Sequence, residues 1–154
     1  MGTRSTIALE YADGTVDQIY CHWDGYLDYN GAILEKFYKD PFKVQKLVEQ
    51  GDMSSLGKEV GTQHAFGVAV KHDDEDGFAV ECTFYKRDRN ESGTDAKRFK
   101  DFQEYQREHQ YEEYEYILRN VNGVATWFVC MYGTDGEYLT MADAIEFRNA
   151  KEEA

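Results

Sequence analysis

The sequence predicts an α+β domain, with a mostly antiparallel sheet built from hairpins and helices packed on at least one face. Two turn signals, Asp13-Gly14 and Asn122-Gly123, each separate stretches of alternating apolar and polar residues. Between them lie segments whose apolar residues recur every three to four positions, as in helices. The 154 residues contain one proline, and neither a linker nor a repeat is visible. A single domain spanning residues 1–154 is therefore expected.

The first expected hairpin joins residues 3–11 to residues 15–23 at Asp13-Gly14. A two-residue loop at this position sets Glu10 opposite Asp17. Like charges on opposite strands repel, so this register carries a cost.

Helices are expected next. Asn30 is a candidate cap for a short helix that carries Ile33 and Leu34 on its apolar face. Asp40-Pro41 has the pattern of an N-cap followed by the first helical residue, and Gly51 is expected to end this second helix.

The middle of the chain carries weaker signals. Residues 52–62 are expected to form a loop. Residues 65–71 and 78–85 are expected to pair as strands around the polar residues 72–77. A further helix is predicted over residues 99–109, where aromatic residues recur at helical spacing.

The strongest signal is the second hairpin, in which residues 113–121 and 124–132 meet at Asn122-Gly123. Both turn residues tolerate the positive φ that a type I′ turn requires. The register sets Tyr116 opposite Val129, within an apolar ladder on one face of the sheet. A last helix is predicted to begin at Thr140, with Asp143 placed to assist its cap.

Charge limits the classes of partner. The chain has 30 acidic and 17 basic residues, a formal net charge of −13. Such a surface repels phosphate, so direct binding to nucleic acid or to an anionic membrane is not expected. It would instead attract a protein with a basic surface.

The three cysteines form no CxxC pair, so neither a disulfide framework nor a zinc knuckle is indicated, and no metal or cofactor is expected. The first five residues lack the apolar core of an export signal. The longest apolar run, residues 124–132, is too short to cross a bilayer. A cytoplasmic location is therefore expected.

The stretch Tyr20-Cys-His-Trp-Asp-Gly-Tyr26 concentrates reactive side chains. In a strand, neighbouring side chains point to opposite faces, so Cys21 and His22 are not expected to share a metal ion. His22 and Asp24 could share a face and form an imidazole oriented by a carboxylate. Alternatively, Asp24-Gly25 is a turn. In a third interpretation His22, Trp23 and Tyr26 form the rim of a ligand site.

Residues 86–100 form a basic segment with six basic and three acidic residues. Guanidinium groups bind phosphates in a bidentate manner, and a glycine allows close backbone approach, which indicates a site for a nucleotide-type ligand. The candidate residues for this site are Lys86, Arg87, Arg89 and Gly93. Alternatively, these bases pair with neighbouring acids on a solvated loop.

Two acidic segments are candidates for a partner-binding surface. The candidate residues are Asp73, Asp74, Glu75, Asp76, Glu112, Glu113 and Glu115. The run at 73–76 lacks the glycine and glutamate positions of a calcium-binding EF-hand loop. A binding surface would require the fold to gather these acids on one side.

Five segments carry a resemblance to a known family. They are residues 4–8 (RSTIA), 19–26 (IYCHWDGY), 40–44 (DPFKV), 82–93 (CTFYKRDRNESG) and 110–118 (QYEEYEYIL). Together they resemble a family of small acidic proteins encoded by tailed bacteriophages and prophages. The resemblance implies a viral source and action in the host cytoplasm. It supplies no catalytic residues.

Three functional hypotheses remain open. The leading one is a non-enzymatic phage accessory protein that binds and modulates a host factor with a basic surface, such as an inhibitor of a host defence. The second is a binder that sequesters a nucleotide-type signal through residues 86–100. The third is an enzyme that uses His22 and Asp24. The P-loop, the GxSxG elbow and the HExxH motif are absent from the sequence.

Overall fold

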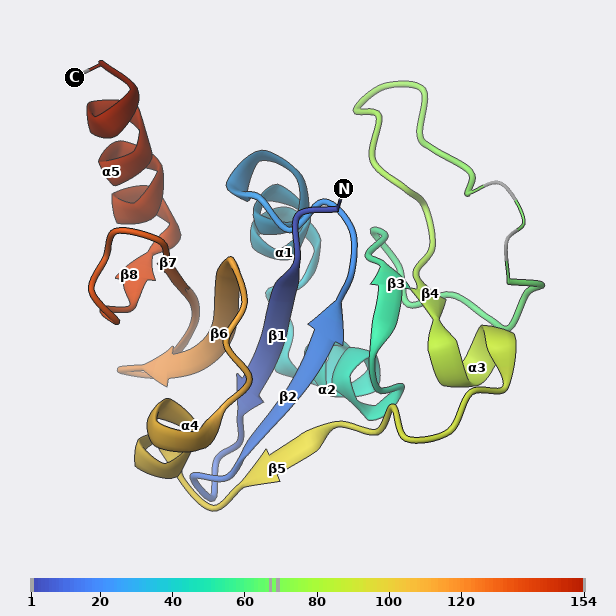
Figure 1. Ribbon diagram of the computed structural model, residues 1–154, viewed down its shortest axis with the longest axis horizontal. Coiled ribbons are helices and arrows are strands. Elements are labelled where there is room, and N and C mark those ends of the chain that lie inside the picture. The colour runs from blue at the N-terminus through green and yellow to red at the C-terminus, as the bar shows by residue number, and fades with distance from the viewer. Residues whose placement is uncertain (1, 67, 69, 154) are drawn as a thin grey trace.

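The computed structural model describes residues 2–66, 68 and 70–153, and Figure 1 shows a twisted sheet with helices on both faces. The sheet order is β4-β3-β2-β1-β6-β7-β8, and β5 pairs with β2. The strands are β1 (Ser5–Glu10), β2 (Val16–Cys21), β3 (Met53–Ser55), β4 (Thr83–Phe84), β5 (Lys97–Phe99), β6 (Tyr114–Val121), β7 (Val124–Met131) and β8 (Leu139–Thr140). The helices are α1 (Ala32–Phe37), preceded by a π-helical turn over Leu27–Gly31, α2 (Pro41–Glu49), α3 (Tyr85–Arg89), α4 (Phe102–Glu108) and α5 (Met141–Glu153).

The predicted α+β class is confirmed. Most neighbouring strands are antiparallel, but β1 and β6 run parallel at the centre of the sheet. Helices α1 and α2 pack on one face, where they bury residues such as Ile33 and Leu47 against the sheet. Helix α4 packs on the other face, and its Tyr105 lies in a second, smaller core with Ala8 and Ile117.

The first hairpin forms, but its predicted register is wrong by one residue. Its loop has three residues, because the amide of Tyr11 donates to the carbonyl of Thr15 at 2.8 Å. Gly14 takes φ of +92°, the left-handed geometry that closes such a loop. Leu9 therefore lies opposite Asp17, and the expected repulsion between Glu10 and Asp17 is avoided.

Of the N-caps predicted for the two helices after this hairpin, one is present and the other is not. Asp40 caps α2 as predicted, and its side chain accepts from the amide of Phe42 at 3.0 Å. Asn30 does not cap α1. It is buried in the preceding π-helical turn, where its side-chain amide donates to the carbonyl of Trp23 at 3.1 Å. Asn30 therefore fixes the path of the chain as it leaves β2.

The predicted strand pair over 65–71 and 78–85 is largely wrong. Positions 67 and 69 lie outside the described residues, and the pairing is reduced to one isolated bridge between His72 and Ala79. The reason is a competing partner, since the amides of Lys58 and Glu59 donate to the carbonyls of Ala79 and Val80 at 2.9 Å each. The expected loop at 52–62 begins with a short strand, β3, because Met53 pairs with Cys21 of β2 and with Phe84 of β4.

The second hairpin is confirmed in register, with Tyr114 opposite Met131 and Leu118 opposite Trp127. The last helix also begins where predicted, because the hydroxyl of Thr140 accepts from the amide of Asp143 at 3.2 Å.

The helix predicted over 99–109 is shorter than expected. Phe99 belongs to β5, and α4 begins after Asp101, whose side chain accepts from the amide of Glu104 at 2.8 Å. Within the described part of the chain, no helix is long and apolar enough to cross a membrane.

Trp127 links the second hairpin to the helical layer, and this contact gives a stability prediction. It is 2% exposed, and its indole nitrogen donates to the carbonyl of Tyr38 at 2.9 Å. Trp127→Phe removes this bond and leaves a small void, so we expect the free energy of unfolding to fall by about 2 kcal/mol in urea denaturation. Trp23→Phe, at a position 43% exposed, is the control and should cost much less. Equal losses of stability in the two variants would show that Trp127 does not link the second hairpin to the helical layer.

Candidate functional site

A hollow of about 730 Å³ lies between the end of the second hairpin and α5. We call it the α5 groove, and its volume is within the range typical of ligand sites. It is lined by Tyr111, Glu112, Glu113, Tyr114, Met131, Tyr132, Phe147, Arg148 and Lys151.

The groove exists because α5 is attached to the domain by its first two turns. Met141 and Ala144 are the buried residues of this helix, and both lie near its start. The remaining turns project past the edge of the sheet, as Figure 1 shows. The side of α5 that faces the second hairpin therefore remains open.

Aromatic side chains dominate the wall of the groove. Tyr132 is 97% exposed and Tyr111 is 66% exposed, while Tyr114 and Phe147 are half-buried. Large exposed aromatic side chains are uncommon on a soluble surface and are enriched at binding interfaces. This wall is therefore suited to contact another molecule.

The groove contains both basic and acidic side chains, but the acidic side chains have fewer charged partners than the basic ones. Arg148 donates to Asp28 at 2.8 Å, and the amino group of Lys151 lies 5.4 Å from the centre of the Phe147 ring. Within the part of the chain that the structure describes, Glu112 and Glu113 form no ion pair. Burial raises the pKa of Tyr114, and the nearby carboxylate of Glu113 raises it further.

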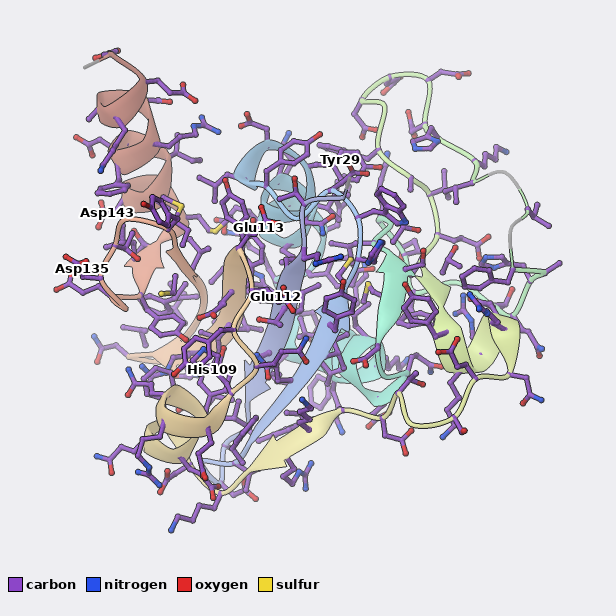
Figure 2. The ribbon with its side chains drawn as sticks, in the orientation of Figure 1. Tyr29, His109, Glu112, Glu113, Asp135 and Asp143 are labelled. Carbon is purple, nitrogen blue, oxygen red and sulfur yellow. The ribbon has the colours of Figure 1, made fainter. Side chains whose placement is uncertain are left out.

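The segment 109–113, which we call the acidic strap, carries Glu112 and Glu113 from α4 to β6. Figure 2 shows His109, Glu112 and Glu113 in succession along this path, with Asp135 and Asp143 on the side of α5. The strap is fastened to β2, because Gln18 and Gln110 exchange two hydrogen bonds of 3.0 Å.

A buried pair, His109 and Glu115, supports the strap from below. Their side chains are 3% and 5% exposed, and Nε2 of His109 lies 2.8 Å from a carboxylate oxygen of Glu115. Nδ1 of His109 lies 2.6 Å from the carbonyl of Tyr105. Because a carbonyl only accepts, Nδ1 carries a proton. The contact between Nε2 and Glu115 therefore ties the imidazole to the carboxylate inside the fold.

Glu115 was predicted to belong to an acidic surface, and that prediction is wrong. The side chain points into the face of the sheet that α4 covers, where it also accepts from the amide of Glu112 at 3.2 Å and from the hydroxyl of Tyr138 at 3.3 Å. Glu115 therefore positions the strap and is almost entirely buried.

A smaller hollow of about 340 Å³ adjoins the α5 groove and shares Tyr111, Glu112, Met131 and Tyr132 with it. His109, Glu115 and Cys130 line its deeper part. Burial raises the pKa of Cys130, so its thiol is protonated near neutral pH. Thiolate chemistry has no support here, because the thiolate is the nucleophilic form.

The second acidic segment lies elsewhere. Asp73 and Asp76 bind the amino group of Lys58 at 2.9 and 2.7 Å, and Asp74 and Glu75 are exposed. This segment belongs to the connection between β3 and β4, at the opposite edge of the sheet from α5 (Figure 1). The two predicted acidic sets therefore do not form one surface.

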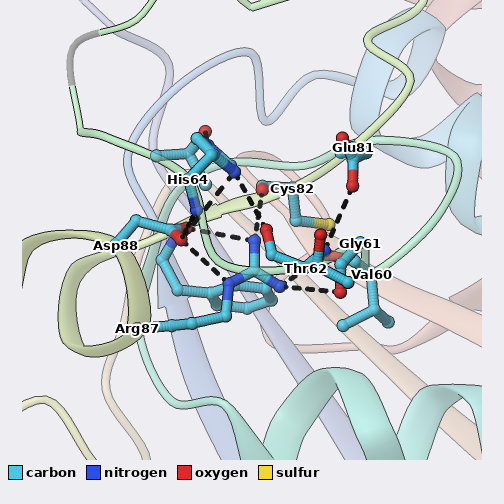
Figure 3. A network of polar contacts seen from close by, with 10 residues as sticks. Val60, Gly61, Thr62, His64, Glu81, Cys82, Arg87 and Asp88 are labelled. Atoms are coloured by element: carbon cyan, nitrogen blue, oxygen red, sulfur yellow. Dashed lines mark hydrogen bonds and ion pairs between the residues drawn. The ribbon is translucent and has the colours of Figure 1, made fainter.

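Arg87 is used inside the protein, as Figure 3 shows. Its guanidinium donates to the carbonyls of Val60, Gly61 and Cys82 at 2.8, 3.1 and 2.9 Å, and to both carboxylate oxygens of Asp88. Burial acts to raise the pKa of Asp88, but hydrogen bonds from Arg87 and from backbone amides outweigh it and hold the pKa below its usual value. Arg87 therefore fastens the segment before His64 and has no donors left for a phosphate.

The other candidates of the basic segment also have partners. Lys86 binds Asp95 at 3.0 Å, and Arg89 binds Glu91 at 3.4 Å while its guanidinium lies 5.0 Å from the centre of the Phe66 ring. Gly93 has φ of +77° and no neighbour that a side chain would meet. The geometry favours the interpretation in which these bases pair with nearby acids.

The stretch at 20–26 is largely structural. His22 pairs with the hydroxyl of Tyr20 at 2.8 Å, so these two share a face as the alternation predicts. Asp24 has a left-handed φ of +58°, and its carbonyl accepts from the amide of Asn30 at 3.1 Å, so its backbone helps to hold the connection between β2 and the π-helical turn. Burial raises the pKa of Cys21 to about 12, so this thiol is inert.

Two of the three residues expected to form the rim of a ligand site are accessible at the surface. Trp23 and Tyr26 are both partly exposed. Trp23 lines a hollow of about 240 Å³ together with Tyr29 and Phe66, among other residues, but His22 and Tyr26 do not line it. The three predicted rim residues therefore do not converge on one cavity.

Sequence reasoning missed His109, Tyr132 and Phe147. The expected register already placed Glu115 on the face opposite Tyr116. What it could not show is that α4 covers this face and brings a histidine to the carboxylate. No family model, curated protein or solved structure matches the chain.

The Arg87 network gives a second stability prediction. Arg87→Lys keeps the charge but cannot reach three carbonyls and Asp88 together, so we expect a loss of about 2–4 kcal/mol in urea denaturation. Arg89→Lys is the matched control and should change the stability by less than about 0.5 kcal/mol, because this side chain is exposed. Similar losses for both variants would contradict the structural role of Arg87.

A third prediction concerns Glu115. Glu115→Ala leaves His109 buried without its partner, so we expect a loss of about 3 kcal/mol and faster hydrogen exchange at the amide of Glu112. Glu113→Ala, on the same segment but exposed, should leave both quantities close to those of the parent protein. Unchanged exchange at Glu112 in Glu115→Ala would show that the pair does not hold the strap.

Proposed function

We propose that this protein is a non-enzymatic accessory protein of a tailed phage, which acts by binding a host protein that has a basic surface. The observation that carries the proposal is the α5 groove. It combines the exposed rings of Tyr111 and Tyr132 with the free carboxylates of Glu112 and Glu113, in a chain of net charge −13.

Charge and aromatic surface have separate roles in such binding. A net negative field accelerates the encounter with a basic partner and falls off with added salt. Exposed tyrosines then supply most of the contact energy once water is excluded, because they bury a large area at a small entropic cost.

The class of partner follows from the same physics. Proteins whose own groove holds nucleic acid present a basic surface, and an acidic protein can occupy that surface. Nucleases, restriction or CRISPR components and polymerases are such proteins. The resemblance to phage-encoded proteins makes a host protein of this class the expected target.

The two alternatives have less support. A nucleotide site in the basic segment would need the guanidinium of Arg87, which is occupied within the fold. An enzyme built on His22 and Asp24 would need the two side chains to cooperate. Instead the imidazole of His22 pairs with Tyr20, and no contact between His22 and Asp24 is found among the described residues.

A binding panel tests the proposal. Purified basic nucleic-acid-binding proteins of a bacterial host are compared with acidic proteins of similar size by biolayer interferometry, at low and at physiological salt. We expect at least one basic protein to bind with a Kd of about 1 μM or tighter at low salt, and to bind more weakly as salt is added. Undetectable binding to every basic protein at low salt would overturn the proposal.

A further inference from the structure

We propose that the α5 groove captures an arginine side chain of the partner, with the guanidinium against the rings of Tyr111 and Tyr132 and paired with Glu112 and Glu113. This inference rests on the proposed function and specifies the chemistry of the contact. It assigns recognition to one groove and not to the overall charge.

The first argument is the state of the two carboxylates. Glu112 accepts from the side-chain amide of Gln110 at 2.9 Å, and Glu113 accepts from the backbone amide of Arg4 at 3.3 Å. Neither carboxylate has a cationic partner among the residues that the structure describes, although ten ion pairs between lysine or arginine and a carboxylate occur elsewhere in that part of the chain. A carboxylate beside an exposed ring matches the charge of an incoming guanidinium.

The second argument is that the groove already accommodates cations of its own. The amino group of Lys151 lies near the ring of Phe147, and Arg148 binds Asp28 beside Tyr114. The carboxylate of Asp28 holds the pKa of Arg148 above its usual value, with Glu152 acting in the same direction. The far wall of the groove therefore contains both kinds of contact that are proposed for the near wall. One cation lies near an aromatic ring, and another is paired with a carboxylate.

Arginine fits this wall better than lysine. A guanidinium is planar, so it can stack on a tyrosine ring while its donors reach two carboxylates. An ammonium is compact and strongly hydrated, and it loses more of its hydration when it enters the groove. Glu115 holds the backbone of Glu112, and Gln110 donates to the Glu112 carboxylate, so this acceptor has a defined position for a planar donor group.

Binding in the groove also has a consequence for α5. This helix has 13 residues, and its last five described residues, 149–153, are all exposed. Isolated helices of this length are marginal in water, so these residues should exchange amide hydrogens quickly in the free protein. A partner seated between α5 and the strap would slow that exchange.

The test uses hexa-arginine and hexalysine peptides, which carry the same charge, with Kd measured by fluorescence anisotropy. The groove variant Glu112→Gln/Glu113→Gln is compared with Asp74→Asn/Glu75→Gln, which removes the same charge at the opposite edge of the sheet. We expect hexa-arginine to bind the groove variant about 10-fold more weakly and the control variant less than about 2-fold more weakly. Tyr132→Ala should weaken binding by a similar factor, whereas Tyr26→Ala should not.

The outcomes separate the two proposals. Equal weakening by both charge variants would show that bulk charge attracts the peptide, which overturns the groove and leaves the proposed function standing. Equal affinity for both peptides would overturn the choice of arginine. If neither the peptides nor any basic protein bind the parent protein, the proposed function fails and this inference with it. Thermal melts guard against misfolding, and Tyr132→Ala should melt as the parent does because that ring is 97% exposed.

Discussion

The parallel pairing of β1 with β6 is the constraint on which the rest of the structure depends. It joins Ser5 to Tyr114 and Leu9 to Leu118, across more than a hundred residues of chain. Each hairpin alone is a two-stranded ribbon, which is marginal in water. Once joined, the two hairpins form a sheet wide enough to receive helices on both faces. The joint also places the start of β6 beside the start of β1, where the strap carrying Glu112 and Glu113 enters the sheet.

How much could be predicted from the sequence depended on the range of the interactions. The turn at Asn122-Gly123 and the cap at Asp40 are local, and both were predicted correctly. The first hairpin was displaced by one residue, since Asp13-Gly14 suits a two- or a three-residue loop and only the closing bond of Tyr11 decides. The strand pair around 72–77 failed because residues 58 and 59 compete for the same carbonyls. The burial of Glu115 depends on α4, which no local pattern places.

The net charge of the chain does not describe how the charged side chains are distributed over the structure. A net charge of −13 suggests a uniformly acidic surface, but the structure divides the charges into separate groups. Arg87, Lys86 and Arg89 are neutralised by neighbours, and Lys58 neutralises part of the run at 73–76. Glu115 is buried against His109. Among the described residues, the carboxylates of Glu112 and Glu113 have no ionic partner, and they lie next to exposed aromatic rings. Composition alone could not distinguish these groups.

In the projecting helix α5, the residues that serve folding differ from those that line the groove. Folding relies on Met141 and Ala144 at its base, whereas Phe147, Arg148 and Lys151 further along line the groove and contribute little to the core. Substitutions in the outer turns are therefore nearly neutral for folding and can be selected for their effect on the bound molecule alone. A chain arranged in this way can change its specificity over generations while its sheet and core remain the same.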